Sequence, residues 1–183
     1  MITTENVKNG VNVDQLMATI EAVQGNPELA KFKFRSKNNW IEGGNCVSSI
    51  KSFYGVGEED TTRDKTFTLE CDHPQVLLGK DKAPTPPEVI LHALGSCLTG
   101  AMVYHAAAQG IDIDAAESSM EGDMDLQGFL GLKPEVRKGF NGITFKIKVK
   151  SEATDEQLEE LAKYSPVFDM IVNPTPVQIV FER

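Results

Sequence analysis

The longest apolar stretch of the chain is residues 84–110, PTPPEVILHALGSCLTGAMVYHAAAQG. Polar side chains are few between residues 89 and 108, which predicts a helix that is apolar almost all round and therefore buried. Thr85 is suited to cap this helix, with proline and Glu88 in its first turn. At 1.5 Å per residue, roughly 24 residues span about 36 Å, enough to cross a domain of this size.

A helix of this length and composition is also long enough to cross a membrane. Two histidines and two glycines inside the stretch, and no Lys/Arg cluster close to either end, speak against that alternative. We therefore expect the helix to form the core of a soluble domain, with Cys97 at its midpoint and no membrane as partner.

Residues 12–24 have the one-sided spacing of an amphipathic helix. Their apolar side chains recur three, four, seven and ten positions apart, at Val13, Leu16, Met17, Ile20 and Val23. Gly25 ends the predicted helix, and Asn26-Pro27 caps a short second turn through Leu29. We expect a small N-terminal helical piece laid on a sheet.

Alternation of polar and apolar residues predicts strands in the first half of the chain. Residues 31–35, KFKFR, and residues 66–71, TFTLEC, both alternate. Residues 40–45, WIEGGN, predict a turn, and residues 46–53 predict the returning strand of a hairpin. Residues 72–87, rich in Pro, Gly and Asp, are predicted as the loop that leads into the long helix.

The second half of the chain returns to alternation. Residues 115–126 alternate, residues 142–150 (GITFKIKVK) form the clearest predicted strand, and residues 177–182 (VQIVFE) predict a final strand. TDEQ at residues 154–157 fits a capping box that opens a helix through Tyr164. Strands on either side of a helix-rich middle indicate an α+β fold with largely antiparallel sheets.

In that second half, Ser165-Pro166 has the residue types of a helix N-cap and first position. We therefore expect the helix that ends near Tyr164 to be interrupted or restarted there, with a second short helix through Met170. This predicts a structural role for the Ser165 hydroxyl.

Composition narrows the classes of partner. The formal net charge is −9 and the sequence pI is about 4.8, which argues against nucleic acid and anionic membrane surfaces. The first ten residues lack a signal-peptide layout, and three widely spaced cysteines fit neither a disulfide framework nor a zinc site. We expect a cytoplasmic protein without metal or other cofactor, since His73, His92 and His105 have no ligand partners in motif order.

Cys97 is the one strong candidate for chemistry. A thiol on a buried helix can simply be a small core residue, and with an ordinary pKa of about 8.5 a reactive Cys97 needs a cation or strong donors nearby. His92 and His105 lie on other faces of the predicted helix and are poor candidates for its base. Cys71 is predicted to lie on the apolar face of a strand and to belong to the core. Cys46 is predicted to be a core or surface thiol.

Several motifs together resemble the OsmC/Ohr family of osmotically inducible and organic-hydroperoxide-resistance proteins. They are PPEVILHALGSC before a long apolar helix, then VRKGFNGITFKIKV, then YSPVFDMIVNPTPVQIVFE. The resemblance covers about residues 31–183, an OsmC-like domain, with residues 1–30 as an N-terminal helical extension. It implies an intertwined homodimer in which antiparallel sheets pack around long central helices.

The resemblance also implies thiol-dependent reduction of hydroperoxides, preferably organic ones. By motif match, Cys97 attacks the peroxide and becomes a sulfenic acid, while an arginine held by a carboxylate stabilises the developing charge. Glu88 matches the carboxylate to within one position. A second cysteine then captures the sulfenic acid, and an external thiol or dithiol reduces the disulfide.

Three features depart from the family pattern. Ser165 matches the second cysteine, and a serine forms no disulfide. No arginine lies between Arg35 and Arg63, where the family has one in its first hairpin. Nine residues along a straight helix turn about 180° and advance about 13.5 Å, so Glu88 would have to act from a partner subunit or a non-helical start. Cys46 is an alternative resolving thiol.

Two hypotheses follow from these observations. The first is an antioxidant thiol protein that reduces hydroperoxides with Cys97 and an external reductant. The second is a non-enzymatic homodimer of the same fold that binds a small apolar ligand at its interface.

Overall fold

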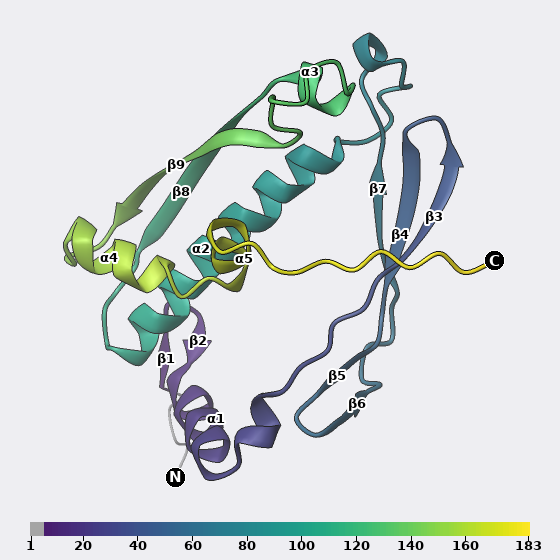
Figure 1. Cartoon of the computed structure of the whole chain (residues 1–183). Helices are drawn as coiled ribbons and strands as arrows, with labels where there is room; N and C mark the ends of the chain where they lie inside the picture. The colour runs from purple at the N-terminus through teal and green to yellow at the C-terminus, as the bar shows by residue number, and fades with distance from the viewer. Residues whose placement is uncertain (1–5) are drawn as a thin grey trace. The chain divides into compact units, whose positions relative to one another are not determined.

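The computed structural model describes residues 6–183, which divide into two compact units. One unit is Asp14–Ile90, and the other joins the chain up to Val13 with Leu91–Arg183. Figure 1 gives the order of the elements. Each unit is an α+β structure with small antiparallel sheets, which confirms the predicted fold class.

The Asp14–Ile90 unit opens with helix α1, Val13–Gly25, and a 3₁₀ helix, Pro27–Ala30. The Asn26 side chain accepts from the Glu28 N–H, so the predicted helix and the capped turn that follows it are confirmed. A three-stranded antiparallel sheet follows, in the order β3 (Lys37–Glu42), β4 (Asn45–Ile50) and β7 (Phe67–Cys71). β5 (Phe53–Gly55) and β6 (Glu58–Asp60) form a separate hairpin.

The prediction of a strand at residues 31–35 is wrong. Only Lys33 pairs, through an isolated bridge to Tyr54. The phenylalanines that produce the alternation pack instead against Phe53, Phe32 stacked with ring centroids 6.0 Å apart and Phe34 tilted at 5.7 Å. The apolar side chains of this segment thus form an aromatic cluster, and its backbone forms no hydrogen-bonded ladder.

The first hairpin is shifted from its predicted position. Its first strand is β3, so residues 40–42, expected in the turn, belong to the strand, and the turn itself is Gly43-Gly44. All six residues of β3 are exposed, so neither face carries the apolar alternation that marks a half-buried strand. The predicted returning strand also breaks at Lys51-Ser52, between β4 and β5.

The other unit is built on helix α2, Pro86–Ala108, most of which it contains. Beside α2 runs the hairpin of β8 (Ala115–Met124) and β9 (Phe140–Lys150), with helix α3 (Leu126–Phe129) in the connection (Figure 1). Helices α4 (Asp155–Ala162) and α5 (Pro166–Val172) follow. Two short strands, β1 (Val7–Lys8) and β2 (Val11–Asn12), complete the unit.

The core of this unit lies between α2, β9 and α4. Its buried centre is Met102, Ala106, Leu158 and Leu161, and partly buried residues that include Ile147 and Val149 pack against it. Along β9, apolar side chains are half-buried and lysines are exposed, as the alternation predicts. The α2 backbone also lies close to β8, because a Cβ at Gly95 would come within 2.2 Å of Met120 Cε.

Helix α2 is buried along one face only, so the prediction of burial on all sides is wrong for a single chain. Its buried residues are Leu94, Gly95, Leu98, Met102, Ala106 and Ala107. Within residues 6–183, α2 is the helix whose length and composition would allow it to cross a membrane, and 28% of its most apolar 18-residue window is buried.

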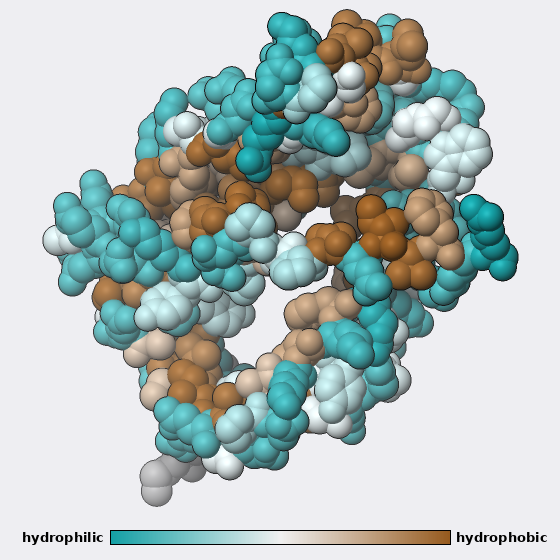
Figure 2. All heavy atoms as spheres, viewed as in Figure 1, coloured by the Kyte–Doolittle hydropathy of each residue, from teal (hydrophilic) through white to brown (hydrophobic). Residues whose placement is uncertain are grey.

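The predicted strand at residues 177–182 does not form. Its backbone pairs with no strand within residues 6–183, and its apolar side chains are exposed, from 68% at Val180 to 86% at Phe181. Figure 2 shows hydrophobic atoms open to the viewer along this C-terminal segment. A strand needs the edge of another strand to bond to, and alternation along the sequence does not supply one.

Candidate functional site

Cys97 lies at the midpoint of α2, as predicted, and is a free, half-buried thiol. Ser96 beside it is exposed, whereas Leu98 is buried. Mid-helix residues have their backbone groups bonded within the helix, so α2 offers Cys97 no unpaired N–H groups. A thiolate at Cys97 therefore depends on side chains from outside its own helix.

Glu88 closes a capping box at the start of α2. Its carboxylate accepts from the Thr85 N–H at 2.7 Å and from the Thr85 hydroxyl at 2.8 Å, and the Glu88 N–H donates to Thr85 Oγ1 at 3.4 Å. These bonds, first from the backbone and then from the hydroxyl of Thr85, lower the pKa of Glu88. The carboxylate is exposed and charged at neutral pH.

The geometry of α2 keeps Glu88 apart from Cys97 of the same chain. α2 is continuous from its first residue to its last, so the nine-residue spacing turns the two side chains about 180° apart. Across residues 6–183, Glu88 forms no ion pair with an arginine. Its assignment as the catalytic carboxylate stays a prediction.

The two arginines that flank the first hairpin have other partners. Arg35 makes two hydrogen bonds to the Glu59 carboxylate, at 2.7 and 2.8 Å. Arg63 donates to the Lys51 carbonyl at 3.0 Å, and its guanidinium carbon lies 4.7 Å from the centroid of the Phe53 ring. Each guanidinium thus stabilises its own unit of the chain.

Ser165 has the structural role predicted for it. It is fully buried, and its hydroxyl oxygen accepts from the Phe168 N–H at 3.1 Å as the N-cap of α5. Pro166 follows as the first residue of that helix. The position where the family resemblance places a second cysteine therefore carries a helix cap.

Cys46 and Cys71 lie opposite each other across β4 and β7. Both are free and half-buried, so the prediction of Cys71 in the core is only partly right. The opposition follows from the register of two strands that are distant in sequence. Only a correct pairing of β4 with β7 would have revealed it from the sequence.

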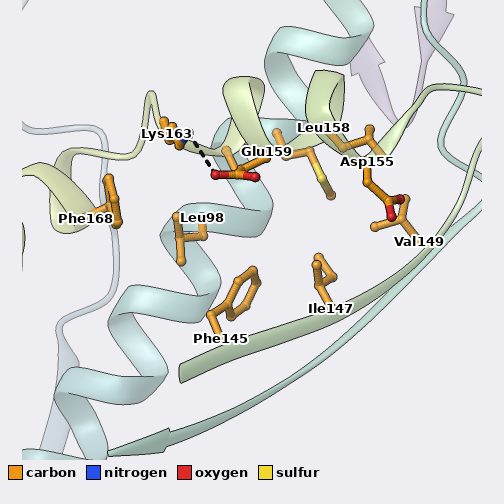
Figure 3. Close-up of a pocket in the computed structure, with 11 residues that line it drawn as sticks. Leu98, Phe145, Ile147, Val149, Asp155, Leu158, Glu159, Lys163 and Phe168 are labelled. Atoms are coloured by element: carbon orange, nitrogen blue, oxygen red, sulfur yellow. Dashed lines mark ion pairs between the residues drawn. The ribbon is translucent and has the colours of Figure 1, made fainter. Parts of the chain in front are cut away.

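A cavity of about 460 Å³ opens between α2, β9, α4 and α5 (Figure 3). Its walls are mainly apolar and include Leu98, Phe145 and Phe168. Glu159 and Lys163 form an ion pair of 2.8 Å at one side. Sequence reasoning missed this cavity because its lining comes from four separate elements.

Within residues 6–183, neither His92 nor His105 hydrogen-bonds to Cys97. His92 is exposed, and His105 is half-buried with its ring stacked on Tyr164 at 4.1 Å between centroids. Throughout the described part of the chain, no three His, Cys, Asp or Glu side chains gather in the manner of a metal site.

A family model described as OsmC-like protein matches residues 79–180, which include α2, both long strands β8 and β9, and Cys97. That match covers more than half of the chain. The chain belongs to the OsmC-like family. The resemblance seen in the sequence motifs is thereby confirmed.

Solved structures of OsmC-like proteins share the fold. An OsmC-like protein from Mycoplasma pneumoniae has a TM-score of 0.56 at 15% identity, over 78% of this chain and 89% of that one. A Legionella pneumophila structure, named an organic hydroperoxide resistance protein OsmC, has a TM-score of 0.51 at 17% identity, over 77% and 90%. At these identities the likeness concerns the fold. No curated protein matches the chain.

Proposed function

We propose that this OsmC-like protein reduces organic hydroperoxides through Cys97. The observation that best supports the proposal is a free, half-buried thiol at the midpoint of the helix that the family match includes. The name of the Legionella pneumophila structure, an organic hydroperoxide resistance protein, points to the same chemistry.

The reaction begins with attack of the Cys97 thiolate on the terminal oxygen of the hydroperoxide. The O–O bond breaks, the alkoxide takes a proton and leaves as an alcohol, and Cys97 becomes a sulfenic acid. One external thiol condenses with the sulfenic acid and releases water. A second thiol attacks the mixed disulfide, so that Cys97 returns to the thiol and the reductant leaves as its disulfide.

The proposed cycle needs no second cysteine at position 165. The Ser165 hydroxyl is buried and engaged with the Phe168 N–H, and a serine oxygen cannot accept the sulfenic sulfur as a disulfide. The reductant is therefore an external thiol or dithiol. Without this reductant, excess peroxide oxidises the sulfenic acid further.

We also propose that the protein acts as a cytoplasmic homodimer. Two features support a second copy: α2 has apolar side chains beyond its buried face, and residues 177–181 carry exposed apolar side chains on an unpaired strand sequence. Three free thiols suit a reducing compartment. Sedimentation that shows only a species of about 20 kDa at micromolar concentration would contradict the dimer.

The cavity between α2, β9 and α4 supports a second candidate function, the binding of a small apolar ligand. Its volume of about 460 Å³ lies within the range of small-molecule sites, about 300–1,000 Å³. Ala162, which lines the cavity, offers a test because a leucine there would fill part of the space. If binding is the function, Ala162→Leu weakens uptake of an apolar dye while peroxide consumption is absent in both proteins.

The peroxidase proposal is tested by the consumption of cumene hydroperoxide with excess dithiothreitol. Cys97→Ser is expected to abolish turnover, and a sulfenic-acid probe is expected to label Cys97 in the wild-type protein. Equal rates for wild type and Cys97→Ser would refute the proposal.

Glu88→Gln tests the predicted catalytic carboxylate. Glutamine also fits the third position of a capping box, so this variant keeps the cap of α2 and loses the charge. A loss of turnover at unchanged stability would support a catalytic role for Glu88. Unchanged turnover would leave Glu88 as the cap that its contacts with Thr85 describe.

A further inference from the structure

Cys46 and Cys71 form a pair of thiols on one face of the β3–β4–β7 sheet. β4 and β7 run antiparallel through five consecutive residue pairs, from Cys46↔Cys71 to Ile50↔Phe67, without a shift in register. Directly opposite residues in such a ladder have Cα atoms about 4.5–5.5 Å apart and side chains on the same face. A disulfide requires a Cα separation of about 4.4–6.8 Å. The pair meets that requirement.

The end of the ladder that carries the two thiols is held firmly. Asn45, which precedes Cys46, is buried and donates from Nδ2 to the Cys71 carbonyl at 3.1 Å and to Glu70 Oε1 at 2.8 Å. Asp72, which follows Cys71, is buried and bonded to three backbone N–H groups. These bonds tie the two strands together where the thiols lie opposite each other, and both thiols are half-buried.

The electrostatics of Cys71 agree with this geometry. Burial raises the pKa of the Cys71 thiol, and the nearby Cys46 raises it further. A raised pKa makes the Cys71 thiolate scarce at neutral pH, so an oxidant meets Cys71 mainly as the thiol. Reaction is therefore expected to start at Cys46.

We propose that Cys46 and Cys71 are a reversible dithiol–disulfide couple, a second redox site that works without Cys97 and exchanges electrons with small disulfides. It rests on the register of β4 and β7 and does not depend on the proposed peroxidase function. In the first step the Cys46 sulfur attacks a small disulfide, forms a mixed disulfide and releases one thiol. The Cys71 sulfur then attacks the Cys46 sulfur, loses its proton, and releases the second thiol. The protein loses two electrons and two protons, and the small disulfide gains them.

Closing this disulfide would cross-link the sheet at the point where the chain leaves it for α2. The segment between the two cysteines contains the β5–β6 hairpin and the other four residue pairs of the β4–β7 ladder. A cross-link between directly opposite residues fixes their register, because a slip by one residue would turn one thiol to the other face. The oxidised protein is therefore expected to have a higher thermal midpoint than the reduced protein.

The test uses the full chain with Cys97→Ser, treated with oxidised glutathione and then alkylated. Trypsin separates the two cysteines into the peptides 38–51 and 66–80. We expect these peptides to be joined, with a mass about 2 Da below the sum of the reduced peptides, and both thiols to return after dithiothreitol. Because Cys97 is absent, failure of the peroxidase proposal does not affect this result.

A matched control moves one thiol along the same strand face. Leu69 of β7 lies opposite Ser48 of β4. In the variant that combines Cys71→Ser with Leu69→Cys, the new thiol is therefore diagonal to Cys46, with the two residues about 7–8 Å apart. That separation exceeds the Cα distance that a disulfide spans, about 4.4–6.8 Å. We expect this variant to carry glutathione adducts and no joined peptides.

Three results would overturn the proposal. They are free thiols at both positions after oxidised glutathione, stable glutathione adducts on both cysteines, and joined peptides that arise equally in the diagonal variant. A joined pair in the Cys46/Cys71 protein that is missing from the diagonal variant would support it.

Discussion

Replacing Ser165 by alanine separates a structural serine from a catalytic one. The substitution removes the hydroxyl that accepts from the Phe168 N–H at 3.1 Å and leaves the backbone bonds of Ser165 in place. Its backbone N–H donates to the Ala162 carbonyl at 3.0 Å, and its carbonyl accepts from the Asp169 N–H at 3.0 Å. The change is therefore confined to one side-chain hydrogen bond at the junction of α4 and α5.

The cost of that bond follows from its position. Loss of a serine N-cap costs about 1 kcal/mol, with a range of about 0.5–2. Ser165 is 0% exposed, so solvent does not easily reach the Phe168 N–H that loses its acceptor, and an unsatisfied buried donor costs about 1–3 kcal/mol. We expect Ser165→Ala to lower the free energy of unfolding by about 1.5 kcal/mol. With a urea m-value of about 2 kcal/mol/M, the midpoint falls by about 0.7 M.

Urea denaturation at one fixed protein concentration measures this effect. Thr154→Ala is the matched control, because Thr154 caps α4 through an exposed hydrogen bond of 3.3 Å to the Gln157 N–H. Solvent can replace that bond, so its loss should cost about 0.5–1 kcal/mol. If Ser165→Ala leaves the midpoint unchanged but slows peroxide consumption, the structural reasoning fails.

Two further predictions concern one loop and one core position. The pKa of Asp72 is lowered, first by the backbone hydrogen bond from His73 and then by those from Lys82 and Lys80, so its charge adds stability above the unfolded pKa of about 3.9. The difference in thermal midpoint between wild type and Asp72→Asn should be largest at neutral pH and shrink below about pH 4; a constant difference would contradict this. Met102 is 1% exposed, so Met102→Ala should lower the free energy of unfolding by about 2–5 kcal/mol. Met102→Leu, which nearly keeps the side-chain volume, should lower it by less than about 1.5 kcal/mol. Equal losses for the two variants in urea titrations would show that side-chain volume does not matter at this position.

Features set by neighbouring residues were predictable from the sequence. The capping box at Thr154, the Ser165-Pro166 helix start and the alternation of β9 each lie within a few consecutive residues. The long helix and Cys97 at its midpoint were found in the same way. Local hydrogen bonding and side-chain periodicity determine these features, and they need no knowledge of what lies across the sheet.

Features set by distant residues were not predictable. β3 is exposed on both faces, and its sequence KNNWIE has two adjacent apolar residues, Trp40 and Ile41, in place of an apolar alternation. The alternation at residues 177–182 is real, but it creates no strand without a neighbouring edge. The opposition of Cys46 and Cys71 depends on strand register. For the candidate site, Cys97 was found, but the cavity needed the packing of four elements.

The loop after β7 is specified mainly through backbone groups, and this sets which substitutions it can accept. The Asp72 carboxylate accepts hydrogen bonds from the backbone N–H groups of His73, Lys80 and Lys82, at 2.8, 3.2 and 3.2 Å. Any residue except proline supplies such an N–H, so the side chains at 80 and 82 are free to vary as far as this anchor is concerned.

Gly79 is the exception in that loop, since a Cβ there would lie 1.8 Å from the His73 carbonyl oxygen. At the tip of the loop, Leu78 is 95% exposed. A saturation library over residues 73–82 should therefore tolerate most changes at the tip and at Lys80 and Lys82, apart from proline at those two lysines and at Leu78, whose φ of 64° proline cannot adopt. It should reject nearly every change at Gly79. Substitutions in this loop would therefore keep its backbone conformation while changing the side chains on its surface.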